Sequence, residues 1–523
     1  MAWIKAAQSS DLEGRDRLLV KSDGRQVALF RMNGRWHACD NRCPHEGYPL
    51  IEGTLGPGCL LTCNWHNWKF DLSDGHTLVG GDRLRVYPVD ERDGALWVDL
   101  TDPPPEDRLA WAMEGLREAF EDEDEARMAR ELARIGAAGG DPLQAVAKAV
   151  VWSHDRMEYG TTHAFAATAD WLSLRERDAR SEPERLVPLV ESLLHMAEDV
   201  VGEPVFAYTT QAERYDEAAL QDAIEAENEP AAQAQLNGAL AEGKGFADLE
   251  PVLARAALAH YQGFGHAAIY VVKTGELACR LGPEAQAPLL RALLRYLVYT
   301  RREDLIPEFR AYAPALVAWR DGKNPPPPAE SFISGSVKQV LGSIANAGAP
   351  PPALFDRLLE AAALQMLYFD LGRQDRVDGP VSQNVGWLDF THAVTFANAS
   401  RRLAERHPEL WPACLLQIGC FLGRNARYLD TSLDPDEWRV ADPQSFLAEA
   451  RRGLFDHRES EPIVAAHLVK LLTAVSEEAA RAPEDVAPVL TAAARRLLES
   501  PLRRKHALRT AAQALNFVGG AAP

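Results

Sequence analysis

The sequence predicts a multidomain protein in which a small all-β domain is followed by a large all-α domain. At 523 residues the chain exceeds the roughly 250 to 300 residues at which a single hydrophobic core stops growing, so more than one domain is expected. Short β-prone runs separated by turn dipeptides fill residues 1–100, whereas apolar residues recur with a helical period from Arg108 onward. With 46% hydrophobic and 25% charged residues, the composition is that of a globular protein.

Turn signals mark the strands of the first domain. The stretch RLLVKSDGRQVALFRMNGRWHACD contains LLV, a DG turn, VALF, an NG turn and WHA, which predicts a meander of short antiparallel strands. The same pattern returns in KFDLSDGHTL, RLRVYPV and ALWVDL. The TDPPPED segment then predicts an extended proline linker, so the expected domains are 1–100, the linker 101–107, and 108–523.

Helical periodicity continues through residues 108–523, where Ala, Leu, Glu and Arg dominate. Breaks at IGAAGGDP, DGKNPPPPAES, NAGAPPP and GRQDRVDGP separate the expected helices. We therefore expect an all-helical second domain.

Charge and composition argue against several classes of function. A formal net charge of −20 repels a phosphate backbone, so nucleic acid is not an expected partner. The longest apolar stretches, such as AAIYVV, are far shorter than the roughly 20 residues that span a bilayer, and the N-terminus has no apolar signal region. We therefore expect no membrane association and a cytoplasmic location. Seven cysteines in so long a chain are too few for a disulfide framework.

Cysteine and histidine alternate in one short segment, where CPH at residues 43–45 is followed by CNWH at residues 63–66. Thiolate and imidazole ligands together suit zinc or iron. Zinc sites usually pair two cysteines in one loop with two histidines or two further cysteines in the other, whereas here each loop carries one of each. Two such loops fit a [2Fe-2S] cluster in which one iron binds both thiolates and the other binds both imidazoles.

This segment, with the intervening EGYPLIEGTLGPGCLLT and the following KFDLSDG and RLRVYPV, resembles the Rieske iron-sulfur family over most of residues 1–100. The resemblance implies that Cys43 and Cys63 bind one iron of a [2Fe-2S] cluster. It also implies that His45 and His66 bind the other, solvent-facing iron.

Details of the loops are similar to the low-potential ferredoxin and oxygenase type of this family. The chain lacks the additional cysteine pair of high-potential respiratory members, and Trp68 and Phe70 stand where those members have serine and tyrosine. Asn67 replaces the usual glycine, and because Asn tolerates a left-handed backbone the loop is expected to keep its shape. Cys39 and Cys59 are expected to be small buried hydrophobic residues and not ligands.

A one-electron carrier fused to a large second domain suggests that the second domain consumes electrons. GFGHAA at residues 263–268 follows a helical run and does not complete a dinucleotide fingerprint, so the electrons are expected from an external NAD(P)H-dependent reductase or ferredoxin. The catalytic domain of ring-hydroxylating Rieske oxygenases is not supported, because DFTH at residues 389–392 lacks the second histidine of that motif. A ferritin-like di-iron site would need two Glu-x-x-His motifs, which we do not find.

Histidines are nevertheless unevenly placed in the helical domain. A lone histidine on an apolar helix is more often a hydrogen-bonded core residue than a ligand, and the Rieske fusion shifts that balance toward ligands. The candidate catalytic residues are His163, His260, His266, His392 and Lys273, and the candidate ligands of a second, non-haem iron are His154, His163, His260, His266 and His392. His195 is expected on a solvated helix face, and His457 and His467 receive no role.

Three of these segments resemble the questin oxidase-like family, whose histidine-rich helical members include oxidative ring-cleaving enzymes. GFGHAAIY and THAVTFANASR place His266 and His392 at histidines of that family. TTHAFAA matches its His-x-x-His only in His163, with Ala166 in place of the second histidine. In fungal relatives the iron is held by several histidines and a modified lysine, which draws attention to Lys273 and Lys338 without assigning either.

We therefore expect a Rieske-type oxygenase in which the [2Fe-2S] cluster passes electrons to a non-haem iron in the helical domain, for O2-dependent oxidation of an organic substrate, aromatic compounds included. The alternative is an electron-transfer or redox-sensing protein whose helical domain only docks partners. A third interpretation, a hydrolytic His-Asp domain, rests on His154 and Asp155 but lacks the upstream histidine of such domains. The expected partners are the reductase or ferredoxin, the substrate and O2, and a homo-oligomer stays open.

Overall fold

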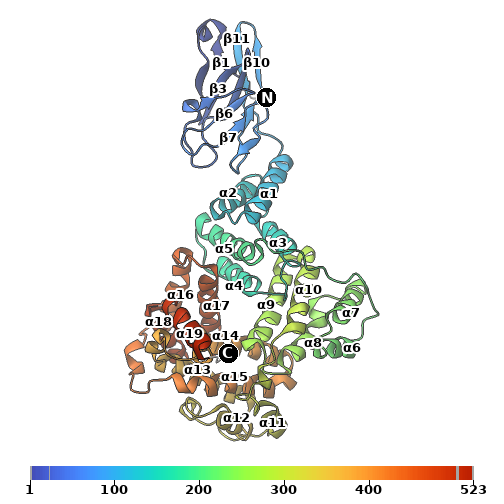
Figure 1. The fold of residues 1–523 in the computed structure, drawn as a ribbon, viewed down its shortest axis with the longest axis vertical. Coiled ribbons are helices and arrows are strands. Elements are labelled where there is room, and N and C mark those ends of the chain that lie inside the picture. Colours follow the sequence, from blue (N-terminus) through green and yellow to red (C-terminus); the bar gives the residue numbers. More distant parts are fainter. Residues whose placement is uncertain (1–2, 23, 502–505, 521–523) are drawn as a thin grey trace. The chain divides into compact units, whose positions relative to one another are not determined.

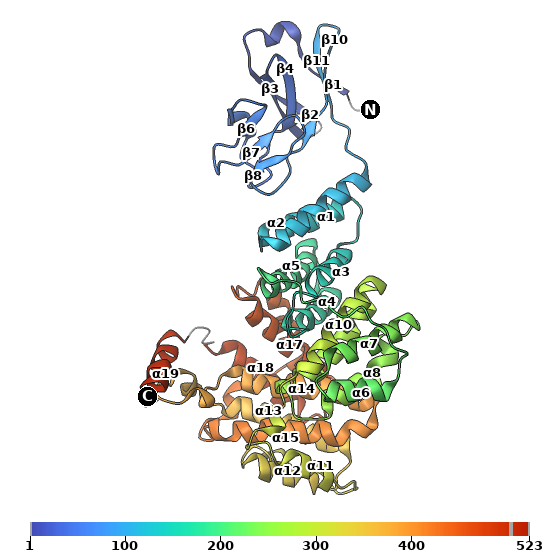
Figure 2. The same cartoon turned by 45° about the vertical axis from the view of Figure 1, so that its right-hand side comes forward.

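The computed structural model describes residues 3–22, 24–501 and 506–520 (Figure 1 and Figure 2). Internal contacts divide the chain into two compact units, Met1–Ala145 and Val146–Pro523. Within the described residues the strands lie in the first unit and the second unit is helical, which confirms the predicted fold class. None of the described helices is both long enough and apolar enough to cross a membrane.

The β part of the first unit consists of short antiparallel strands. They are β1 (Trp3–Gln8), β2 (Arg17–Ser22), β3 (Arg25–Met32), β4 (Arg35–Asp40), β5 (Thr54–Leu55), β6 (Leu60–Thr62), β7 (Lys69–Asp71), β8 (Thr77–Val79), β9 (Val86–Tyr87), β10 (Val89–Arg92) and β11 (Ala95–Asp99). In the described part of the chain they form three sheets, ordered β1-β11-β10, β2-β3-β4-β9 and β5-β6-β7-β8. The predicted DG and NG turns join β2 to β3 and β3 to β4.

Strand β3 is buried on both faces and separates two cores. Successive side chains of a strand point to opposite faces. Val27 and Leu29 therefore face a core formed with β1 and β11, whereas Ala28 and Phe30 face a second core that also contains Cys43. Because Cys43 and Cys63 belong to this second core, the loops that carry them pack directly against the sheet.

Helices α1 (Pro105–Glu121) and α2 (Glu125–Ala137) complete the first unit. The buried Asp82 carboxylate accepts hydrogen bonds of 3.1 and 2.7 Å from Arg130 and also pairs with Arg134, so α2 is tied to the loop after β8. Because these helices pack with the β part, the compact unit extends to Ala145, well beyond the domain end predicted at residue 100.

The segment predicted as an extended proline linker, residues 101–107, is instead fixed to the β part at its start and helical from Pro105 onward. The Asp102 carboxylate lies 2.8 Å from both Arg25 and Arg85, which fixes the segment's start to the β part. Helix α1 begins at Pro105, where proline is well tolerated because the first helical N–H has no intrahelical partner.

The second unit is built from helices packed around one large apolar core. They follow α3 (Pro142–Ser153), which spans the division, and are α4 (His163–Asp178), α5 (Glu182–Val200), α6 (Glu217–Glu225), α7 (Glu229–Ala241), α8 (Phe246–Leu258), α9 (His266–Leu281), α10 (Pro283–Tyr299), α11 (Tyr312–Ala318), α12 (Val337–Ala345), α13 (Pro351–Tyr368), α14 (Trp387–Arg406), α15 (Trp411–Asn425), α16 (Pro443–Gly453), α17 (Pro462–Ala479), α18 (Ala487–Glu499) and α19 (Ala507–Gly520).

Four of these helices enclose the centre of the unit. Helix α4 packs against α9, α9 against α14, α14 against α17, and α17 against α4, so the four form a closed ring of neighbours (Figure 1). Side chains that point inward from all four helices therefore meet at one place.

Candidate metal sites

Two loops of the first unit have the same backbone shape. The Gly47 N–H donates to the Cys43 carbonyl at 2.8 Å, and the Asn67 N–H donates to the Cys63 carbonyl at 3.0 Å. Gly47 has φ 77° and Asn67 has φ 61°, so both adopt the left-handed conformation. The prediction that Asn67 replaces glycine without loss of the loop is confirmed, because Asn is among the residues that tolerate this region.

The two loops bring their cysteines and histidines together. Cys43 and Cys63 are 4% and 1% exposed, whereas His45 and His66 lie at the surface. The Nδ1 atoms of His45 and His66 are 3.1 Å apart. Burial, together with the adjacent Cys63 thiol, raises the pKa of the Cys43 thiol to about 11, so a metal that binds there must displace a proton.

Tryptophan rings hold both imidazoles in place. Trp68 stacks on His45 with ring centroids 4.5 Å apart, and Trp65 stacks on His66 at 5.1 Å. Gly80 makes room for Trp68, because a Cβ at Gly80 would lie 2.3 Å from the indole ring. The imidazole orientation is thus set by packing before any metal binds.

Four histidines converge at the centre of the helical ring, one from each of α4, α9, α14 and α17. The Nε2 atoms of His266 and His392 are 2.8 Å apart. The ring centroid of His163 lies 4.6 Å from that of His266 and 4.8 Å from that of His467. One nitrogen from each of His163, His392 and His467 lies within 4.8 Å of the other two, a spacing that could hold a metal ion.

The outer nitrogens of these rings are already engaged. Nδ1 of His266, His392 and His467 each lies 2.6 Å from a backbone carbonyl oxygen of the preceding turn. A carbonyl only accepts, so Nδ1 carries the proton and Nε2 keeps its lone pair, as in most histidine ligands of metals. Nε2 of His163 and of His467 is buried and has no partner among the described residues.

All four imidazoles are neutral at pH 7. Burial lowers the pKa of His266 to about 3, and it lowers the pKa of His163, His392 and His467 well below the usual value. A second cause shared by all four is the Lys470 ammonium, which is itself buried. Burial lowers the pKa of Lys470 to about 8, and its Nζ has no partner in the described part of the chain.

A strained turn positions His266 at the start of α9. Gly263, Phe264 and Gly265 have φ of 55°, 50° and 78°, and a left-handed conformation is unusual for phenylalanine. The Glu303 carboxylate accepts the Phe264 N–H at 2.9 and 3.0 Å, which compensates for the strain. Burial raises the pKa of Glu303 to about 7. Such strain is common where a structure must aim one side chain.

The structure brings together only part of the predicted set. His163, His266 and His392 meet as predicted, and His467 joins them although the sequence analysis gave it no role. His260 instead bonds to the Glu225 carboxylate at 2.8 Å, because it follows the end of α8 and faces acidic side chains. It lies outside the histidine cluster.

Two further candidates also lie elsewhere. His154 stacks on Tyr208, and its Nδ1 lies 2.9 Å from the Val151 carbonyl, so this ring is a packed core histidine. The Lys273 ammonium is engaged by the Asp170 carboxylate at 2.8 Å. The prediction of a solvated His195 is wrong, since this residue is 2% exposed on α5.

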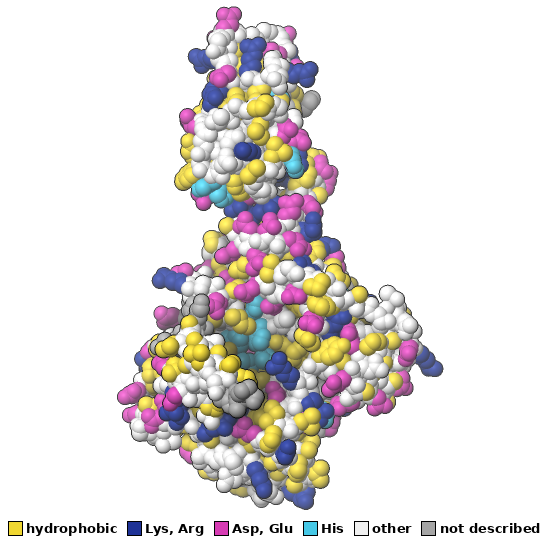
Figure 3. All heavy atoms as spheres, viewed as in Figure 1, with side chains coloured by type: hydrophobic (Ala, Val, Ile, Leu, Met, Phe, Trp, Pro, Cys, Tyr) yellow, Lys and Arg dark blue, Asp and Glu magenta, His cyan; other side chains and the backbone are white. Residues whose placement is uncertain are grey.

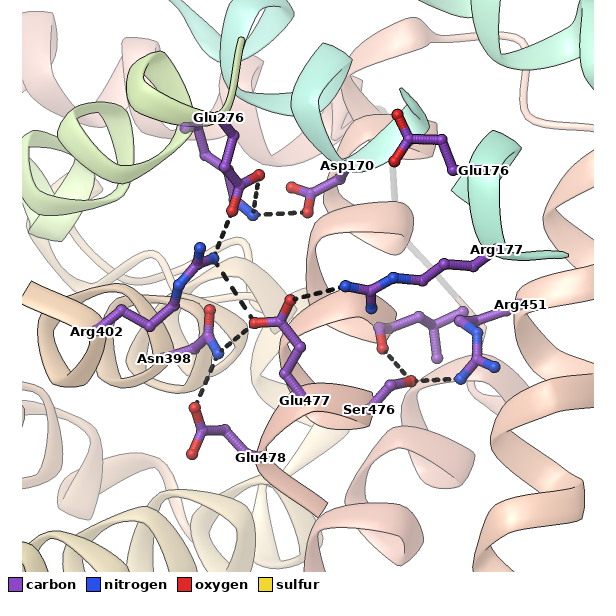
Figure 4. A network of polar contacts seen from close by, with 12 residues as sticks. Asp170, Glu176, Arg177, Glu276, Asn398, Arg402, Arg451, Ser476, Glu477 and Glu478 are labelled. Carbon is purple, nitrogen blue, oxygen red and sulfur yellow. Dashed lines mark hydrogen bonds and ion pairs between the residues drawn. The ribbon is translucent and has the colours of Figure 1, made fainter. Parts of the chain in front are cut away.

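A buried polar network cross-links the four histidine-bearing helices (Figure 4). Lys273 bridges Asp170 of α4 and Glu276 of its own helix α9. Arg402 of α14 pairs with Glu276 and with Glu477 of α17. These bonds fix the four helices relative to one another, and with them the histidines.

A cavity of about 390 Å³ reaches the histidine cluster. Its walls come from α14, α17, α18, α19 and the segment 374–386, and His467 is one of the lining residues. Figure 3 shows histidine side chains in a hollow on one face of the helical unit. A small molecule could therefore approach the cluster from solvent.

Residues 2–87 match the family model of the Rieske [2Fe-2S] domain. The ferredoxin component of the naphthalene 1,2-dioxygenase system of Pseudomonas putida is 31% identical over 101 residues, which cover 19% of this chain and 96% of that protein. The chain belongs to the Rieske [2Fe-2S] family.

Other relatives are larger than the region they share with this chain. The 4beta-methylsterol monooxygenase of Methylococcus capsulatus is 34% identical over 113 residues, 19% of this chain and 30% of that protein. The solved terminal oxygenase of carbazole 1,9a-dioxygenase from Nocardioides aromaticivorans is 28% identical, covers 20% of this chain and 31% of its own, and has a TM-score of 0.18. The chain thus spans 30% of the length of that monooxygenase, and it spans 19% of the length of the Oxidoreductase NdmD of Pseudomonas putida.

A Rieske domain implies a [2Fe-2S] cluster, and the donor set found here suits one. Two buried sulfurs and two convergent imidazole nitrogens at the surface are the ligands that such a cluster requires. Cys39 is fully buried on β4, as predicted. The prediction for Cys59 is wrong, because this residue is half-buried in a left-handed turn, with its Sγ 3.6 Å from His37 Nε2.

The buried His195 gives the fold a measurable acid sensitivity. Burial lowers its pKa from 6.5 to about 4, so the unfolded chain binds a proton below pH 6.5 that the folded chain excludes. The free energy of unfolding should therefore decrease as the pH is lowered, and His195 alone should account for about 2 kcal/mol of the decrease between pH 7 and pH 5.

Urea unfolding of the metal-free protein at pH 7 and at pH 5 measures this decrease. A His195→Leu variant should lose less stability, whereas the exposed His76→Leu control should match the wild type; equal losses in all three would contradict the assignment.

Proposed function

We propose that this protein is an oxygenase in which a [2Fe-2S] cluster in the Rieske domain supplies electrons to a non-haem iron in the helical unit. The observation that carries the proposal is the convergence of four histidines, with the Nε2 atoms of His266 and His392 2.8 Å apart and one nitrogen from each of His163, His392 and His467 within 4.8 Å of the other two. An iron bound there would supply open coordination positions at which O2 is activated against an organic substrate.

The proposed ligands of this iron are His163, His266, His392 and His467. Imidazole nitrogen alone suits iron, copper, nickel and zinc. The fused one-electron carrier favours iron, because zinc has no redox chemistry to use the electron. The protein's own part is to fix the rings of His266, His392 and His467 by their Nδ1–H bonds, to keep the imidazoles neutral by burial, and to limit access of water to the cavity.

The resemblance to the questin oxidase-like family implies a modified lysine beside the histidines. Lys273 does not suit that role, because Asp170 and Glu276 occupy its ammonium. Lys470 suits it better, since its buried Nζ is unpartnered and its pKa is lowered to about 8. We therefore assign the role of the modified lysine to Lys470, a residue that was not among the candidates from the sequence.

The proposed cluster ligands are Cys43, Cys63, His45 and His66. The electrons would come from an external NAD(P)H-dependent reductase or ferredoxin, which docks near the exposed imidazoles. Ferredoxin components of oxygenase systems among the relatives support a role in such a chain of electron carriers.

A second candidate function is electron transfer or redox sensing without a helical iron. The specific observation in its favour is that the ferredoxin component of a dioxygenase system is matched over 96% of its length. In that case the helical unit only docks partners, and the four histidines form a polar cluster without metal.

Metal analysis separates the two functions. The protein should be purified without air, incubated with Fe(II), desalted, and assayed for iron and acid-labile sulfide. We expect about three irons and two sulfides per chain, together with the paramagnetic signal of a reduced Rieske cluster after dithionite treatment. Two irons with two sulfides after the Fe(II) incubation would favour the electron carrier and refute the oxygenase.

A further inference from the structure

The cavity beside His467 is mostly walled by apolar side chains. They come from the segment before α14, from the start of α14, from α17 and from the end of α18, and include Val385, Trp387, Leu388, Ile463, Leu468 and Leu497. Its volume of about 390 Å³ lies in the range of sites that bind small organic molecules. Because His467 is part of the wall, a bound molecule would lie next to the proposed iron.

A cation lines this apolar space. The Arg509 Nη1 donates to the Gln374 carbonyl at 3.0 Å, and the nearby Asp375 carboxylate acts on its charge. Burial lowers the pKa of Arg509. A guanidinium beside apolar walls favours binding of an anionic oxygen through charge-assisted hydrogen bonds.

A second donor belongs to Trp387, the first residue of α14. Trp387 is 4% exposed, lines the cavity, and has an indole Nε1–H without a partner in the described structure. The positive end of the α14 dipole lies at the same residue. Trp387 and Arg509 thus offer two kinds of donor for one carboxylate.

The acidic side chains of the wall limit the charge that the cavity accepts. Asp389 is occupied, since it accepts the Gly386 N–H at 2.9 Å and pairs with Arg424 at 3.3 Å. Glu461 also lines the cavity and offsets the charge of Arg509, and His506 is a further titratable group of the wall. A ligand with more than one negative charge is therefore disfavoured.

We propose that this cavity binds an apolar monocarboxylate, with the carboxylate at Arg509 and Trp387 and the apolar body among the side chains that lead to His467. This assignment names the substrate class for the proposed oxygenase and rests on that function for the reaction. Binding itself requires neither iron nor electrons, so it can be tested separately.

Titration calorimetry of the full-length protein with 2-naphthoate and its neutral analogue 2-naphthamide tests the proposal. We expect the carboxylate to bind at least about tenfold more tightly than the amide. Arg509→Gln should remove this preference, Arg509→Lys should keep most of it, and Trp387→Phe should weaken it. Arg357→Gln, which breaks a surface pair with Asp485, is the matched control and should bind as the wild type does.

Equal affinities for 2-naphthoate and 2-naphthamide in the wild type would overturn the proposal, and so would a preference that survives in Arg509→Gln. Iron and sulfide are assayed in the same samples. A third iron without carboxylate preference would refute the substrate class alone. A carboxylate preference without a third iron would refute the oxygenase and leave the binding site standing.

Discussion

A His392→Ala variant is expected to lose the helical iron while it keeps the [2Fe-2S] cluster. His392 is 3% exposed, and its Nε2 lies 2.8 Å from that of His266, so alanine removes a nitrogen from the middle of the proposed ligand set. Removal of an outer-shell partner alone typically costs about 10- to 100-fold in metal affinity, and loss of a direct ligand should cost at least as much. Iron per chain should fall by one with sulfide unchanged, and O2 consumption driven by a reductase should fall in parallel.

His154→Ala is the matched control for this variant. His154 is also a partly buried histidine of the helical unit, but it stacks on Tyr208 and lies outside the cluster. It should keep the full iron content, while both variants should keep the far-ultraviolet circular dichroism of a helical protein. Iron retained in His392→Ala, or lost equally in His154→Ala, would refute the four-histidine site.

The Rieske domain could be predicted from the sequence because its information is local. Each ligand loop is a short contiguous segment whose cysteine and histidine are two or three residues apart, so the spacing already specifies the donor set. The strands followed from turn dipeptides that need no distant partner. The error at Cys59 arose because cysteine is usually buried, whereas here it occupies a left-handed turn just before β6.

The histidine cluster could be predicted only in part because its members are far apart in the chain. His163 and His467 are separated by most of the helical unit, and they meet because α4 and α17 are neighbours in a closed ring that one sequence cannot order. His467 carried a usable signal, since PIVAAHLVK is apolar around a histidine and a lysine. A search for polar residues within apolar helical runs, which selected His266, would also have selected His467 and Lys470.

The proline segment shows a different limit of sequence reasoning. Three consecutive prolines predicted an extended linker, yet the third of them starts α1. Asp102, which precedes these prolines, is held by ion pairs with Arg25 and Arg85, and neither arginine is adjacent to it in the sequence. Proline fixes φ near −65°, a value shared by extended chain and helix, so the contacts on either side decide between the two.

A Cys63→Ser variant is expected to lose the cluster and, with it, electron delivery to the helical iron. Cys63 is 1% exposed and pairs with Cys43 as the sulfur donors of the proposed site, and a serine oxygen binds iron less well than a thiolate. Reductase-driven O2 consumption should fall on the order of 100-fold or more, since the [2Fe-2S] cluster is the proposed one-electron relay. Iron should fall to about one per chain with no sulfide, because the four helical histidines are untouched.

The comparison with Cys59→Ser separates cluster loss from general damage to the domain. Cys59 belongs to the same core but its sulfur contacts His37 and no proposed cluster ligand, so this variant should keep the cluster and the O2 consumption. Hydrogen peroxide already contains oxygen reduced by two electrons, and it should therefore restore oxidation of a bound substrate in Cys63→Ser but not in His392→Ala. O2 consumption that is unchanged in Cys63→Ser would mean that the helical unit receives its electrons by another route, and the fusion of the two units would then need a different explanation.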